Sequence, residues 1–293
     1  MKPEDYPTLY SECNACAESN QEKHFQLLQV EIVLLIAIAI LGAINWSSFP
    51  SFGILPPLII AVSLAILFVF TVIMESKKFE KNWYTSRAVA EIIKRESWLY
   101  MMKAKPYNQQ REQQAKAKFK KFLKQIVESQ ALPWRELIHN IEVTQITETM
   151  DKKRNASFDE QKEFYIASRI NDQRSWYTKK AKMNHLRESR MTTLMWILLA
   201  LSVALAFVNI ISNDLPINAV GIATTASAAV LSWIGAKNYG ELSQSYSIVA
   251  HELSFLEDDA KQAKTEDQLI NIVLDAEDTM SQEQKIWKIK RLP

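Results

Sequence analysis

The sequence lacks charged residues over three long stretches, and this absence sets the class of the protein. No Asp, Glu, Lys or Arg occurs in residues 32–74, 191–213 or 215–236. Runs of about 20 apolar residues match the thickness of a bilayer's hydrocarbon layer when they are helical. A core helix of a soluble protein normally keeps one polar face toward water. The three runs therefore predict membrane-spanning helices and exclude an ordinary soluble globular protein.

The first uncharged run is too long for one span. It is interrupted by NWSSFPSFGILPP (45–57), whose Pro and Gly residues break helices, and SNDLP (212–216) separates the second pair in the same way. A cleaved signal peptide is disfavoured, because about 26 polar residues precede the first span and a second span follows it. We expect four spans in two hairpins, at about 27–46, 54–74, 191–211 and 217–236.

Glycine is also scarce, with five residues in 293, and few segments alternate apolar and polar residues. Segments without that alternation and with few helix breakers are predicted to be helical. The expected fold is therefore an all-α integral membrane protein, with four transmembrane helices in two hairpins and long cytoplasmic helical extensions.

Lys and Arg are absent from both hairpin loops and concentrated between the hairpins. Residues 75–190 hold 26 Lys and Arg against 15 Asp and Glu, whereas residues 1–31 and 237–293 are each net −4. Cytoplasmic flanks collect Lys and Arg, and translocated loops avoid them. We predict outward-facing loops, a cytoplasmic middle segment and both termini in the cytoplasm of a multi-pass inner-membrane protein. The Lys- and Arg-rich residues 168–190 would then lie near anionic lipid headgroups.

The motifs of common enzymes are missing. The sequence has no HExxH, Walker A, GxGxxG or GxSxG motif, and its four histidines are widely separated. Cys13 and Cys16 form one CxxC pair with no second pair to complete a zinc site. The pair is either two small helix residues, or a redox pair or intersubunit metal site. We expect no enzyme activity, no cofactor and no bound metal.

The predicted spans contain no ionisable residue, which argues against a proton pump or voltage sensor but leaves a pore open. The fourth span carries small residues, which allow close helix packing. Its polar members form either a tight helix contact or a pore lining, and they are Thr224, Thr225, Ser227 and Ser232.

Three further patterns lie outside the spans. An apolar seam at helical spacing packs against either the chain's own middle segment or another subunit, and its members are Tyr239, Leu242, Tyr246 and Leu253. Residues 112–128 form a basic amphipathic helix, either packed on neighbours or lying in the membrane interface. Arg87 with Glu91, and Arg169 with Gln173, stand at i,i+4, where helical side chains meet.

The two halves resemble each other. KNWYTSRAVAEIIKRESWLYMM (81–102) follows the second span and KNYGELSQSYSIVAHELSFLED (237–258) follows the fourth. Both begin with Lys-Asn-aromatic, and they later carry Ala90-Glu91 and Ala250-His251-Glu252. An insertion is needed to align both ends. We interpret the halves as a duplication, with modules at 1–130 and 131–293.

Scattered residues of both halves resemble the SLATT domains. The first set is Trp83, Arg87, Ala90, Glu91, Lys94, Trp98 and Tyr107. The second set is Tyr165, Arg169, Asp172, Gln173, Trp176, Tyr177, Lys180 and Ala181, with Glu252, Glu277, Glu283 and Trp287 toward the end of the chain. The chain resembles two SLATT modules in tandem.

The resemblance implies a bacterial membrane effector of conflict systems, encoded beside nucleotide-signalling synthases or nucleotide sensors, which acts in antiviral defence by forming a pore or disrupting the membrane. We expect membrane lipid and further copies of the chain as partners, and no nucleic acid. The alternative is a non-conducting scaffold that anchors a partner enzyme or nucleotide sensor.

Overall fold

The computed structural model describes the backbone of residues 1–46, 49–108, 111–129, 144–211 and 218–291, and the side chains of these residues except 50 and 282–291. The described residues are helical, with no strand among them, and they include four helices long and apolar enough to cross a membrane. The predicted fold class, an all-α protein with four candidate spans, is confirmed. The expected module boundary at 130–131 lies outside the described residues, as do most residues of the second hairpin loop.

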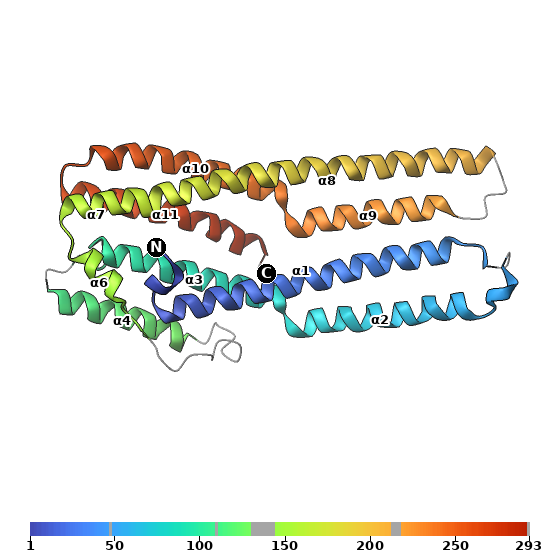
Figure 1. Ribbon diagram of the computed structural model, residues 1–293, viewed down its shortest axis with the longest axis horizontal. Helices are drawn as coiled ribbons and strands as arrows, with labels where there is room; N and C mark the ends of the chain where they lie inside the picture. Colours follow the sequence, from blue (N-terminus) through green and yellow to red (C-terminus); the bar gives the residue numbers. More distant parts are fainter. Residues whose placement is uncertain (47–48, 109–110, 130–143, 212–217, 292–293) are drawn as a thin grey trace. The chain divides into compact units, whose positions relative to one another are not determined.

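The first half begins with the 3-10 turn η1 (Pro3–Asp5) and the long helix α1 (Thr8–Ala43). After the turn η3 (Pro50–Phe52) come α2 (Leu55–Lys77), α3 (Phe79–Met101) and α4 (Glu112–Glu128). The second half contains α6 (Glu148–Arg154), α7 (Phe158–Tyr165), the π-helical turn η4 (Ile166–Asn171), α8 (Asp172–Ile211), α9 (Ala219–Lys237), α10 (Tyr239–Gln262) and α11 (Glu266–Arg291) (Figure 1).

Local sequence explains where several helices begin. Pro56 and Pro57 stand in the first turn of α2, where a missing backbone N–H costs nothing. Ser157 caps α7 by accepting a hydrogen bond from the amide of Glu160, whose carboxylate accepts one from the amide of Ser157. Asn218 caps α9 in the same manner, by accepting from the amide of Gly221.

Two long helical paths, Leu55–Met101 and Ala219–Gln262, are divided by single left-handed residues. Lys78 has φ 51° between α2 and α3, and Asn238 has φ 51° between α9 and α10. Such a residue ends one helix and redirects the next, at a cost for any residue with a Cβ. The breaks therefore mark equivalent points in the two halves.

These breaks give the register of the internal repeat. Lys78 and Asn238 are 160 residues apart, and so are Ala90 and Ala250. One register thus aligns both ends without the insertion expected from sequence. The Lys-Asn-aromatic triplets that we aligned from sequence lie four residues out of this register, and Lys77-Lys78-Phe79 is the true counterpart of Lys237-Asn238-Tyr239.

The chain folds as two compact units. The polar unit comprises Met1–Gln21, Glu80–Ala181 and Gln244–Pro293, and the apolar unit comprises Glu22–Phe79 and Lys182–Ser243. Helix α1 continues without a break from residues of one unit to residues of the other, and so does α8. The polar unit holds most of the buried core, including Trp98, Tyr165 and Leu253.

The apolar unit contains the four spans, and α1 packs against α9 within it. The ring of Phe25 lies 6.0 Å from that of Trp233, and the amide of Asn218 donates to the carbonyl oxygen of Ala43 at 2.8 Å. Large apolar side chains remain exposed, among them Phe68, Trp196, Phe207 and Leu231. In water this surface would be unfavourable, whereas lipid tails can cover it. The chain is a membrane protein with four candidate spans.

Candidate coupling site of the polar unit

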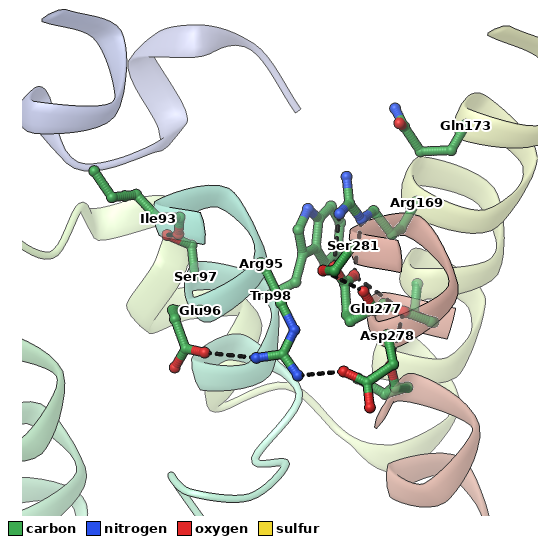
Figure 2. A network of polar contacts seen from close by, with 12 residues as sticks. Ile93, Arg95, Glu96, Ser97, Trp98, Arg169, Gln173, Glu277, Asp278 and Ser281 are labelled. Atoms are coloured by element: carbon green, nitrogen blue, oxygen red, sulfur yellow. Dashed lines mark hydrogen bonds and ion pairs between the residues drawn. The ribbon is translucent and has the colours of Figure 1, made fainter. Parts of the chain in front are cut away.

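A buried ion pair lies at the centre of the polar unit. Arg169, on η4, donates from Nε to Glu277 Oε1 at 2.8 Å and from Nη2 to Glu277 Oε2 at 2.6 Å (Figure 2). Arg169 is 3% exposed and Glu277, on α11, is fully buried. Burial disfavours the charged guanidinium, but Glu277 outweighs it and raises the pKa of Arg169. The two parallel hydrogen bonds make the pair bidentate.

The other contacts of the pair come from both halves of the chain. The Tyr165 hydroxyl donates to Glu277 Oε1 at 3.1 Å, and the Arg169 guanidinium lies 5.7 Å from the ring centroid of Trp98, on α3. Trp98 Nε1 donates to the Tyr6 hydroxyl at 3.0 Å. Arg169 Nη1 has no hydrogen-bond partner among the described residues. The two halves therefore meet at a cation–π contact beside a buried ion pair.

A second ion pair joins α11 to α3. Arg95 on α3 donates from Nη2 to Asp278 on α11 at 2.6 Å and from Nη1 to the neighbouring Glu96 at 2.8 Å (Figure 2). The Tyr107 hydroxyl donates to the other oxygen of Glu96 at 2.7 Å. Helix α11 is thus tied to η4 through Glu277, and to α3 of the first half through the adjacent Asp278.

Charged residues also line α3 nearer the spans. Arg87 and Glu91 form the expected i,i+4 pair at 2.5 Å. Burial alone would raise the pKa of Glu91, but Arg87, Lys94 and Arg169 lower it. Burial lowers the pKa of Lys94. Glu91 therefore stands in a field of three cations, one of which comes from η4.

The second expected i,i+4 pair is wrong. Arg169 turns away from Gln173 and binds Glu277, 108 residues later (Figure 2). Gln173 donates to the neighbouring Asp172 at 3.0 Å. The reason is burial: a carboxylate compensates the charge of a buried guanidinium, whereas Gln173 is neutral. Trp176 is 5.4 Å from the ring of Tyr246, and Lys180 lies 5.6 Å from the ring of Trp176. Trp83 is buried, whereas Glu252 is exposed.

The apolar seam of α10 is largely used inside the chain. Leu253 is fully buried in the core of the polar unit, and Tyr239 is buried. Tyr246 packs on Tyr177 with ring centroids 5.5 Å apart, and Leu242 is half-buried. Of the two partners left open by the sequence, the chain's own helices therefore cover Leu253 and Tyr246.

The polar residues of α9 do not share one environment. Ser227 is buried together with Ala223 and Ala229, as expected for a close helix contact. Thr224 and Ser232 are exposed, and the Thr224 hydroxyl donates to the Val220 carbonyl at 2.8 Å within the helix. A tight contact and an open polar surface thus occur on different sides of one helix.

The remaining candidates lie in the core. Helix α4 buries Ala115, Phe119 and Leu123, so its apolar face is occupied by the protein. Its lysines are exposed except Lys116, which pairs with Asp151 at 2.6 Å. Cys13 and Cys16 are buried thiols, and burial raises the pKa of Cys13 to about 12. A thiol of high pKa is a poor nucleophile. No group of residues able to hold a metal occurs in the described part of the chain.

Two residues of the polar core, Asp278 and Tyr6, were not predicted from the sequence. No local pattern indicates their roles, because their partners come near them only when the helices pack. A repeated motif, however, was readable: Ala17-x-x-Asn20 near the foot of the first span and Ala181-x-x-Asn184 near the foot of the third, with all four residues buried. The side chains of Glu283 and Trp287 lie outside the described residues.

Comparison with known proteins gives two consecutive family matches along the chain. Residues 7–162 match the family described as SMODS and SLOG-associating 2TM effector domain 3. Residues 165–287 match the family described as SMODS and SLOG-associating 2TM effector domain 1. Searches of curated proteins and of solved structures gave no match.

Proposed function

Because the chain belongs to the SLATT family, as two tandem two-transmembrane effector domains of conflict systems, we propose that it permeabilises the bacterial inner membrane when a cytoplasmic signal reaches its polar unit. Several copies assemble to form the pore, and both termini lie in the cytoplasm. SLATT domains associate with SMODS and SLOG nucleotide-signalling genes, so the signal originates from a nucleotide synthase or sensor encoded nearby.

The observation that supports this proposal most strongly is the helical continuity between the coupling site and the spans. Trp98 and Tyr6 stand beside Arg169, and the chain continues from Tyr6 into α1 and from η4 into α8. Neither α1 nor α8 contains a left-handed break. A rotation or shift at the ion pair is therefore carried along stiff helices toward the bilayer.

Purified protein in liposomes tests the proposal directly. We expect leakage of an entrapped small dye from loaded liposomes above that from empty ones, and depolarisation of cells that overproduce the protein before they lose viability. A chain that inserts but never leaks dye or depolarises cells would instead be the non-conducting scaffold.

The exposed hydroxyls of α9 give a sharper test of the water path. Thr224→Val combined with Ser232→Val keeps apolar bulk and removes two exposed hydroxyls, so we expect at least a tenfold loss of leakage with normal insertion. Thr71→Val in α2 is the matched control, because Thr71 is also exposed and donates to a helix carbonyl, that of Leu67. Equal leakage in all three proteins would show that α9 does not line the path.

A further inference from the structure

Helices α3 and α10 are equivalent in the repeat, yet one face differs sharply between them. On α3 this face holds Arg95, Trp98 and Leu99; Trp98 and Leu99 are buried and Arg95 is paired with Asp278. The residues 160 positions later on α10 are Phe255, Asp258 and Asp259, and all three are exposed. The second half of the chain covers this face of α3, and no described residue covers its counterpart on α10.

The open face of α10 has the composition of a protein interface. Phe255 is 70% exposed and Ile248 is 51% exposed, and both lie on the side opposite the buried Leu253. Acidic residues flank this apolar pair, namely Glu252, Asp258 and Asp259. An apolar centre with a charged rim is typical of a surface that binds another protein.

The complementary charge is found on α4. Four exposed lysines occupy the side of α4 away from the core, and Val127 is 47% exposed beside them; the lysines are Lys118, Lys120, Lys121 and Lys124. Helix α4 follows α3 as α11 follows α10, so α4 and α11 are equivalent in chain order. Within the chain, acidic Asp278 of α11 meets basic Arg95 of α3. A contact between the α4 of one chain and the α10 of another would exchange these signs, because α4 is basic and α10 is acidic.

We propose that the exposed face of α10, centred on Phe255, binds helix α4 of a second copy of this chain. In Figure 1, α10 and α4 lie along opposite edges of the polar unit. Because two different surfaces meet in such a contact, a growing assembly keeps one unoccupied α10 face and one unoccupied α4 face at its ends. The assembly closes as a ring if the rotation between neighbouring copies allows it. This inference rests on the proposed function, which requires several copies, but it is tested by assembly rather than by leakage.

Cross-linking between two tagged versions of the full chain tests the contact. One version carries Phe255→Cys and the other Lys121→Cys, while native Cys13 and Cys16 are buried and give little background. With a short bifunctional maleimide we expect a product that carries both tags, and at least tenfold less product from either version alone. A product of Phe255→Cys with itself in similar yield, or no mixed product, would overturn the proposal.

Charge reversal provides an independent test by mass measurement in detergent. Lys121→Glu with Lys124→Glu, and separately Asp258→Lys with Asp259→Lys, are each expected to reduce the oligomer at least tenfold. The four changes together restore attraction and recover the oligomer. Lys105→Glu with Lys152→Glu is the matched control, because both lysines are exposed elsewhere on the polar unit.

The outcomes separate this contact from the proposed function. Oligomers that survive both reversals, or that the combined variant fails to recover, would overturn the α10–α4 contact. Dye leakage without the mixed cross-linked product would support the proposed function and contradict this interface. The mixed product without any leakage would support the interface and contradict the pore.

Discussion

Two neighbouring carboxylates of α11 stand in opposite environments, although both bind an arginine. Glu277 is fully buried against Arg169, whereas the Asp278 side chain is 56% exposed against Arg95. Removing one partner of a buried pair leaves an uncompensated charge in the core, whereas an exposed pair is screened by water. The position of a residue, more than its charge, decides what its ion pair contributes.

This contrast predicts the effect of removing each carboxylate. Glu277→Gln leaves the Arg169 charge buried, and we expect it to lower the free energy of unfolding by about 3–5 kcal/mol. Asp278→Asn, the adjacent control, is expected to cost about 1 kcal/mol or less. Thermal unfolding in detergent measures both. If the double variant Arg169→Met with Glu277→Leu recovers most of the lost stability, the unpaired charge causes the loss. Equal losses in Glu277→Gln and Asp278→Asn would contradict this explanation.

The lowered pKa of Glu91 predicts a dependence on pH. Because the pKa of this carboxyl is lower in the folded state, its stabilisation is fully present above its unfolded value, near 4.5, and is lost as pH falls through the folded value. Glu91→Gln is therefore expected to lower the unfolding temperature at pH 7, with the difference from wild type shrinking below pH 4. The exposed Glu163→Gln serves as control. A constant difference across this range would refute the linkage.

At the scale of elements, single left-handed residues decide where spans end and polar helices begin. Lys78 and Asn238 both have φ near 51°, which a residue with a Cβ adopts at a cost and glycine adopts freely. The preceding residues, Lys77 and Lys237, are still helical. In each hairpin, a single residue therefore separates the second span from the polar helix that follows it.

Adjacent glycine substitutions are expected to have opposite signs. Lys78→Gly relieves the left-handed strain, and we expect a gain of up to about 1 kcal/mol. Lys77→Gly weakens the last turn of α2 and is expected to cost about 0.5–1 kcal/mol. Unfolding temperatures of the two variants, measured side by side in detergent, test the assignment. Two losses of similar size would mean that residue 78 is not strained.

At the scale of the whole molecule, the two SLATT domains share one polar core. Arg169 of the second domain lies beside Trp98 of the first, and Arg95 of the first binds Asp278 of the second. Neither domain can bury these groups alone. The tandem arrangement therefore fixes a domain–domain contact whose counterpart on α10 is left open.

Accessibility labelling tests the proposed orientation in the membrane. Phe52→Cys lies in the first hairpin loop, where Phe52 is 51% exposed, and Asn213→Cys lies in the second. Both are expected to react with an impermeant thiol reagent in cells whose outer membrane is permeabilised, because neither loop carries Lys or Arg. Lys152→Cys, exposed on α6, is the control and should react only after lysis of the inner membrane. Labelling of Lys152→Cys before lysis would reverse the topology.

The sequence by itself determined the number of spans, the hairpin pairing and the helical class. A run of about 20 uncharged residues spans a bilayer as a helix, because a helix pairs all of its backbone polar groups internally. It also identified Arg87–Glu91, since both residues lie on one helix four positions apart. Only the tertiary structure decided the partner of Arg169, the register of the repeat and the use of Leu253. Arg169 and Glu277 are 108 residues apart, and their pairing depends on which helices pack together. Local spacing specifies a helix and its faces, whereas packing selects which of those faces another helix covers.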